Sequence, residues 1–155
     1  MIGQQVGNGE CWTLAENALS SVASELRARN GEPCMTSQGL IHGYQIYCYI
    51  PQRPSDPPGG IKAAGVARGD IVQFLNTHFQ RKDGRGSSYA GSPDHTAVVV
   101  AVEADGALKV LEQNVGGVKK VRPGRYDPEE LVAGELRVFR AVGESWVGPL
   151  DAKWP

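Results

Sequence analysis

The chain of 155 residues opens with one strong helical pattern. Between residues 11 and 29, apolar side chains recur every three or four positions, and polar side chains fill the positions between them. This spacing places the apolar residues on one face of a helix. Asn30, Gly31 and Pro33 follow, and such residues end helices. The pattern therefore predicts an amphipathic helix over residues 11–29 with one buried side.

From residue 40 onward, the pattern changes to the alternation and short apolar runs that are typical of strands. Asp105-Gly106 is a strong hairpin signal. Asp127-Pro128 is typical of the start of a short helix, which we predict over 127–132. The segments 51–60 and 81–93 are rich in turn-forming or polar residues and are predicted as surface loops. The predicted strands are 43–50, 69–75, 96–102, 108–113, 117–122 and 135–142.

A helix followed by a meander of strands predicts an α+β fold in which the helix packs on an antiparallel sheet. The length fits one domain, so residues 1–155 are predicted as a single domain. A hydrophobic content of 41% is enough to form a buried core and excludes general disorder. Trp146 and Trp154 are predicted to fasten the C-terminal segment to the body of the domain.

Charge and hydropathy exclude two classes of partner. The net charge is −1, from 16 basic and 17 acidic residues, so no broad positive surface is expected to attract nucleic acid. No apolar run approaches the roughly 18 residues of a membrane span. The N-terminus lacks the basic and apolar regions of a secretory signal. We therefore expect a cytoplasmic protein that binds neither nucleic acid nor membrane.

The three cysteines are too few, and odd in number, for a disulfide scaffold. Cys34 and Cys48 could pair and leave Cys11 alone, although three free thiols in a reducing compartment is the simpler interpretation. Cys11 is distinctive because it begins the predicted helix. Unpaired backbone N–H groups and the positive end of the helix dipole favour the thiolate there. Cys11 is therefore the candidate nucleophile.

His95, at the start of the most apolar predicted strand, is the candidate base. A hairpin with a two- or four-residue loop centred on 105–106 pairs Ala97 with Asn114. Side chains alternate along strands, so His95, Glu112 and Asn114 then share one face. Asn114 would be the diagonal neighbour of the histidine, about 7 Å away, and Glu112 would lie one step farther. Both remain candidates to orient the imidazole ring.

A cysteine, a histidine and a polar group that orients the histidine are the parts of a thiol acyl-transfer site. The imidazole accepts the thiol proton, and the thiolate attacks a carbonyl carbon. The backbone N–H of Cys11 and the amide of Gln5 are candidates to stabilise the oxyanion. The sequence contains no CxxC or HExxH spacing, so no metal and no other cofactor is expected.

This set of residues resembles the papain-like superfamily, most closely the CHAP and NlpC/P60 amidases and peptidases. CHAP domains use a cysteine at a helix start, a strand histidine and a Glu-x-Asn on the next strand. The resemblance therefore implies a papain-like fold and catalytic roles for Cys11, His95, Glu112 and Asn114. Papain-like enzymes also carry a glutamine six residues before a Cys-Trp pair, which implies an oxyanion role for Gln5. The motifs are Gly9 to Ala15, Gly69 to Phe74, Asp94 to Val99 and Leu111 to Asn114.

The segment 7–15, which reads Gly-x-Gly-Glu-Cys-Trp-Thr-Leu-Ala, resembles a narrower group. It is similar to the papain-like C-terminal domain of fungal cortical actin patch proteins that interact with myosin tails. This resemblance implies an intracellular domain of a longer scaffold protein. Two hypotheses follow: a thiol hydrolase acting on an amide, peptide or isopeptide bond of a peptide or protein, or a catalytically silent domain that binds cytoskeletal proteins. A cell-wall amidase is a third possibility, which the narrower resemblance disfavours.

Overall fold

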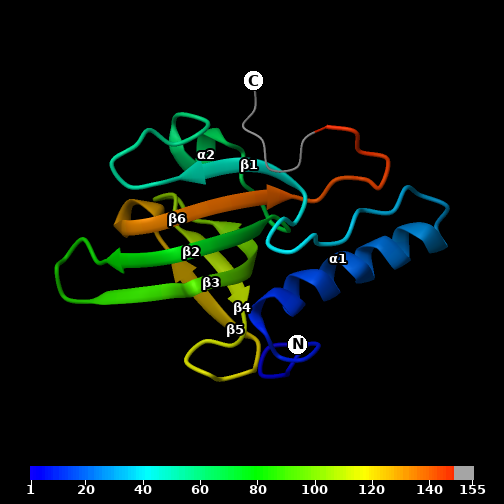
Figure 1. Ribbon diagram of the computed structural model, residues 1–155, viewed down its shortest axis with the longest axis horizontal. Helices are drawn as coiled ribbons and strands as arrows, with labels where there is room; N and C mark the ends of the chain where they lie inside the picture. The colour runs from blue at the N-terminus through cyan, green and yellow to red at the C-terminus, as the bar shows by residue number, and fades with distance from the viewer. Residues whose placement is uncertain (149–155) are drawn as a thin grey trace.

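A computed structural model describes residues 1–148, and one long helix dominates the beginning of the chain (Figure 1). This helix, α1, spans Cys11–Ala28. Its buried face includes Leu14, Ala15, Leu19 and Ala23, as the amphipathic pattern predicted. No side chain caps its N-terminus, so the first-turn N–H groups have no side-chain acceptor.

The described residues form one antiparallel sheet in the order β1-β6-β2-β3-β4-β5. An N-terminal helix on this sheet confirms the predicted α+β fold class. Within residues 1–148, none of the helices combines the length and the apolar character needed to cross a bilayer. The strands are β1 (Tyr44–Tyr49), β2 (Ile71–Gln80), β3 (Ser87–Val102), β4 (Leu108–Glu112), β5 (Arg122–Tyr126) and β6 (Leu131–Arg140), with short helices α2 (Gly60–Ala63) and η1 (Pro128–Glu130).

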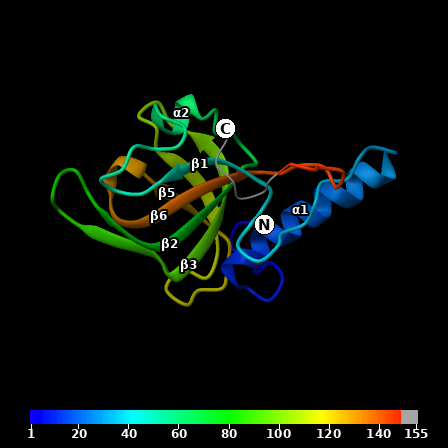
Figure 2. The ribbon, with the colours of Figure 1, turned by 45° about the horizontal axis from the view of Figure 1, so that its top comes forward.

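Alternation along β2 divides the core into two parts. Val72 and Phe74 point into the larger part, which the curled sheet encloses, whereas Ile71 points toward α1. Figure 2 shows this curl, with α1 extending away to one side. The smaller part joins α1 to the sheet through Ile71 and Cys34, so the helix start is held against the sheet.

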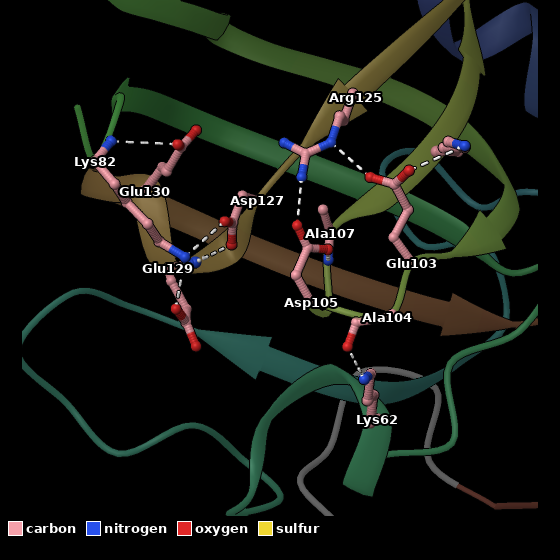
Figure 3. A network of polar contacts seen from close by, with 11 residues as sticks. Lys62, Lys82, Glu103, Ala104, Asp105, Ala107, Arg125, Asp127, Glu129 and Glu130 are labelled. Carbon is pink, nitrogen blue, oxygen red and sulfur yellow. Dashed lines mark hydrogen bonds and ion pairs between the residues drawn. The ribbon is translucent and has the colours of Figure 1, made fainter. Parts of the chain in front are cut away.

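The hairpin between β3 and β4 differs from the prediction. Glu103 pairs with Ala107 across a three-residue turn, in which Gly106 adopts φ 91° and Asp105 Oδ1 accepts a hydrogen bond from the backbone N–H of Ala107 at 3.0 Å. Arg125 of β5 donates to the carboxylates of Glu103 and Asp105, at 2.6 and 2.7 Å (Figure 3). The predicted two- or four-residue loop was wrong because a glycine in the left-handed region allows the odd-length turn.

A bulge between Val99 and Ala101 shifts the same pair of strands again. Ala97 therefore pairs with Glu112, where the sequence predicted Asn114. The turn and the bulge each move the register by one residue, and a shift of two keeps every side chain on its predicted face. The predicted shared face is correct, but Glu112, not Asn114, becomes the diagonal neighbour of the strand histidine.

The long ribbon of β2 and β3 replaces much of the loop predicted at 81–93, because β3 begins at Ser87. Side chains at residues 87–89 are exposed, so the sequence there lacks the apolar alternation of a half-buried strand. The strand predicted at 117–122 was also misplaced. Two glycines with positive φ form a turn at 116–117, and β5 follows at Arg122–Tyr126.

Near the C-terminus, the helix predicted over 127–132 is only the short 3-10 turn η1, which Asp127 caps by accepting from the backbone N–H of Glu129 at 2.9 Å. β6 begins at Leu131, earlier than the predicted strand. Trp146 contacts Tyr44, with ring centroids 5.4 Å apart, which confirms its predicted fastening role. Trp154 lies outside the described residues.

Candidate active site

The start of α1 is held in place by Gln113, a fully buried residue that directly follows β4. Its Nε2 donates to the carbonyl oxygens of Val6 and Glu10, at 2.9 and 2.7 Å, and to Thr13 Oγ1 at 3.0 Å. Its Oε1 accepts from the Val6 backbone N–H at 3.1 Å. One amide thus ties the approach segment and the first helical turn to the sheet, and so fixes the position of Cys11. The sequence analysis did not identify Gln113. Its position between the candidate residues Glu112 and Asn114 was a possible signal.

Cys11 and His95 lie side by side, and each changes the ionisation of the other. Burial raises the pKa of Cys11, but hydrogen bonds with the His95 side chain and with the Thr96 backbone outweigh it, so that the pKa of this thiol is lowered. Burial lowers the pKa of His95, but hydrogen bonds with Cys11 and Glu112 raise it to about 9. The two shifts favour a thiolate–imidazolium pair.

Glu112 is the carboxylate partner of the histidine. Its Oε2 accepts hydrogen bonds from His95 Nε2 at 3.0 Å and from the Tyr126 hydroxyl at 2.6 Å. Burial raises the pKa of Glu112, but these two bonds outweigh it and the pKa is lowered, so the carboxylate is ionised. Because Glu112 occupies Nε2, Nδ1 is the ring nitrogen left for Cys11. The imidazole thus has the sulfur and the carboxylate as its two partners.

Residues of strand β5 surround the Glu112 carboxylate and fix its position. Oε1 lies 3.3 Å from Arg122 Nε, close enough for an ion pair although not aligned for a hydrogen bond. A Cβ added at Gly124 would lie 2.6 Å from Oε1, so only glycine leaves room for the carboxylate. Arg122, Gly124 and Tyr126 were missed because the strand was predicted several residues too early. Their spacing of two along a strand was the available signal.

The other two predicted site residues have different partners. Asn114 Nδ2 donates to Glu10 Oε2 at 2.7 Å, and Glu10 Oε1 accepts from Lys119 Nζ at 2.6 Å. Asn114 therefore borders the cavity at Cys11 with its amide bonded to Glu10, and its catalytic role stays a prediction. The exposed Gln5 donates from Nε2 to the Gly7 carbonyl oxygen at 3.3 Å and does not line this cavity. Its oxyanion role stays a prediction.

A cavity of about 250 Å³ opens beside Cys11 and His95. Residues 89–92 of β3 form one wall, and residues 114–116, at the start of the loop between β4 and β5, form another. A substrate carbonyl placed here would meet the thiolate and the uncapped N-terminus of α1 together. Within residues 1–148, no group of three or more His, Cys, Asp or Glu side chains could hold a metal ion, and all three cysteines are free thiols.

Comparison with known proteins places this chain in a family. Residues 1–151 match the family described as the AIM3/BBC1 Cysteine proteinase-fold domain. "Altered inheritance of mitochondria protein 3" of Debaryomyces hansenii is 32% identical over 151 residues, which cover 96% of this chain and 15% of that protein. "SH3 domain-containing protein C23A1.17" of Schizosaccharomyces pombe is 27% identical over 151 residues, which cover 94% of this chain and 8% of that protein.

Among solved structures, the crystal structure of Ly7917 is similar, with 21% sequence identity and a TM-score of 0.43 over 87% of this chain and 54% of that one. The chain spans only 15% and 8% of the lengths of the two curated relatives. The family match covers nearly all of the chain and confirms the predicted cysteine proteinase fold. The chain belongs to the AIM3/BBC1 cysteine proteinase-fold domain family.

Proposed function

We propose that residues 1–155 form one thiol hydrolase domain that cleaves an amide, peptide or isopeptide bond of a peptide or protein through a covalent acyl-enzyme. The observation that carries the proposal is the array of Cys11, His95 and Glu112 beside an open cavity. A buried imidazole held by a carboxylate favours ionisation of the adjacent thiol, as a nucleophile at neutral pH requires.

The proposed reaction uses the two partners in turn. The Cys11 thiolate attacks the carbonyl carbon and forms a C–S bond, while the Cys11 backbone N–H stabilises the oxyanion. The His95 imidazolium then donates its proton to the leaving nitrogen as the C–N bond breaks. Water, deprotonated by the neutral imidazole, attacks the thioester carbonyl; the C–S bond breaks, the acid is released, and the thiolate–imidazolium pair is restored. Gln5 is the proposed second oxyanion donor, once its amide leaves the Gly7 carbonyl and turns toward the cavity.

A general acyl donor, 4-nitrophenyl acetate, tests the proposal without a known substrate. We expect wild-type protein to acquire an acetyl group on Cys11 and to turn over, and Cys11→Ala to fall to the background rate. The matched control is Cys34→Ala, because the buried Cys34 thiol donates to the Leu19 carbonyl at 3.3 Å and has a raised pKa, with burial as the main cause. This control should behave like wild type.

Iodoacetamide provides a second measurement, with mass spectrometry to locate the label. At pH 7 we expect Cys11 to react about tenfold faster than free cysteine, because a lowered pKa increases the thiolate fraction. Alkylation of Cys11 no faster than that of free cysteine, together with no acetyl transfer, would contradict the hydrolase proposal.

The second candidate function is a catalytically silent interaction domain of a cytoplasmic, cytoskeletal scaffold. The observation that favours it is the size of the relatives. The domain matches a small part of two much longer proteins, and one of these is named for an SH3 domain. Under this proposal, the full-length protein with Cys11→Ala captures the same cytoskeletal partners as wild type, and neither form turns over the ester. Loss of those partners in Cys11→Ala, but not in Cys34→Ala, would refute it.

A further inference from the structure

The cavity beside Cys11 contains one carboxylate without a partner. Asp94 lines this cavity and is half-buried. Among residues 1–148, no side chain or backbone group forms a hydrogen bond or ion pair with its carboxylate. The other two carboxylates near the site are matched, since Glu10 binds Lys119 and Glu112 binds His95. Partial burial of an unmatched carboxylate is unfavourable until a cation approaches it.

The charge of Asp94 acts on the nucleophile. Burial is the main influence that raises the pKa of Cys11, and the negative charge of Asp94 adds to it, against the larger lowering by its hydrogen-bond partners. The charge of Asp94 therefore opposes thiolate formation. A cation bound beside Asp94 would offset this charge and favour the thiolate when the cavity is occupied.

An aromatic ring stands at the rim of the same cavity. Tyr89 is 71% exposed and stacks on His78, with ring centroids 4.4 Å apart and planes 8° apart. The imidazole covers one face of the ring, which is otherwise largely exposed. An aromatic face held in a fixed orientation attracts lysine and arginine side chains. The wall between this ring and Asp94 consists of small residues at 90–92, which leave space for a long side chain.

We propose that this cleft selects substrates with a lysine or arginine next to the scissile bond, with Asp94 as the ion-pair partner of that side chain and Tyr89 as its aromatic wall. The inference rests on the proposed hydrolase function and adds the substrate class. Asp94 and Tyr89 determine specificity in it, and the bond-breaking steps stay with Cys11, His95 and Glu112.

Two thiol reagents of opposite charge test the proposal without a known substrate. One is trimethylammonium-ethyl methanethiosulfonate, a cation, and the other is sulfonatoethyl methanethiosulfonate, an anion. The rate of each at Cys11, divided by its rate at free cysteine, gives a cation-to-anion ratio. We expect this ratio to be about tenfold in wild type and to fall about fivefold in Asp94→Asn. The control Asp83→Asn removes the same charge from an exposed site on the ribbon turn and should leave the ratio unchanged.

The aromatic wall has its own pair of variants. Tyr89→Phe keeps the ring and should retain the wild-type ratio, whereas Tyr89→Ala should reduce it about twofold to threefold. A ratio that is the same in wild type and Asp94→Asn would overturn the proposal. If Asp94→Asn does not fold, a salt titration of wild type replaces it. The cation-to-anion ratio should fall toward one as the salt concentration rises from about 0.02 M to 0.5 M. A ratio that does not change with salt would overturn the proposal as well.

The ratio separates the two proposals. Both reagents require the same thiolate, so the thiolate fraction cancels and only the local charge remains. Failure of acetyl transfer to Cys11 would remove the hydrolase function while leaving the charge selectivity measurable. A cation-to-anion ratio near one in a protein that still turns over 4-nitrophenyl acetate would overturn the cationic substrate class alone.

Discussion

Cys11 and Cys48 are two free thiols that each line a cavity, yet their environments drive ionisation in opposite directions. The pKa of Cys11 is lowered, chiefly by its bond with His95 against the effect of burial. Burial and the Glu135 carboxylate raise the pKa of Cys48 to about 12. The cavity at Cys48 is the larger, at about 420 Å³ against 250 Å³. The charge of the neighbour, not the size of the cavity, distinguishes a nucleophile from a passive thiol.

The backbone positions of Cys48 and Cys11 also contribute to the difference in their pKa values. Cys48 lies within β1 opposite Arg137, and its sulfur donates to Glu135 Oε1 at 3.3 Å. That oxygen also accepts from Arg137 Nε at 2.7 Å, so the carboxylate stays ionised and the thiol keeps its proton. Cys11 instead begins a helix, where uncapped N–H groups favour negative charge.

The largest test of this contrast is His95→Ala. Burial would then dominate the ionisation of Cys11, and its pKa should rise above the ordinary value, as that of Cys48 does. We expect alkylation of Cys11 by iodoacetamide at pH 7 to slow about 100-fold and ester turnover to reach background. Cys48 should react as slowly as before, and Cys34→Ala serves as the control. Alkylation of Cys11 within about twofold of wild type would show that the imidazole does not set its reactivity.

A smaller effect is expected from Glu112→Gln, which keeps a hydrogen-bond acceptor but removes the charge behind His95. Turnover should fall about tenfold. In wild type, cleavage of an amide bond should decline on the alkaline side near pH 9, where the imidazolium loses the proton it gives to the leaving nitrogen. In the variant, this limb of the pH–rate profile should move to lower pH. An unmoved limb would contradict the role of Glu112.

The same pKa of His95 has a consequence for stability. An unfolded histidine titrates near 6.5, so between pH 6.5 and about 9 folded His95 carries a proton that it lacks in the unfolded chain, while Cys11, whose pKa is lowered by its partners against burial, gives up a proton that the unfolded thiol keeps to higher pH. The contribution of His95 to the free energy of unfolding is therefore complete below pH 6.5 and is lost as the pH rises through 9. Urea titrations across this range, compared between wild type and His95→Ala, would measure that slope.

The smallest effect is expected from Tyr126→Phe. The ring keeps its contact with Phe74, 4.5 Å between centroids, while the hydrogen bond to Glu112 is lost. We expect turnover to fall about threefold and the free energy of unfolding to fall by about 1–2 kcal/mol. Tyr49→Phe is a suitable control because Tyr49 lies on β1, away from the carboxylate. A change as large as that of Glu112→Gln would show that the hydroxyl, not the ring, holds the array together.

The sequence was sufficient to predict the helix and two of the candidate site residues, Cys11 and His95. A period of 3.6 places Cys11 at the helix start, and an apolar strand places His95 at a core edge, because both signals depend on neighbouring residues alone. The shared face of His95 and Glu112 was also predicted. This prediction of a shared face was correct although the predicted register was wrong. The turn and the bulge each shift the register by one residue, and a total shift of two leaves each side chain on the same face.

The rest depended on geometry that local patterns do not specify. The choice of Glu112 over Asn114 depends on a bulge and on one left-handed glycine, Gly106. Gln113 bonds Glu10, and Tyr126 bonds Glu112. Both partners come from other parts of the chain, so a local pattern can place the residue on an element but does not name its partner. Their contribution became visible only with the pairing of β4 and β5.

Gly124 has a consequence for mutational studies of this family. The residue meets neither sulfur nor imidazole, yet a methyl group there would occupy the position of the Glu112 carboxylate. A saturation screen for hydrolysis should therefore rank this inconspicuous strand glycine almost as intolerant as the nucleophile. Screening for folded protein alone would tend to overlook it, because a displaced carboxylate can disable chemistry in a domain that still assembles.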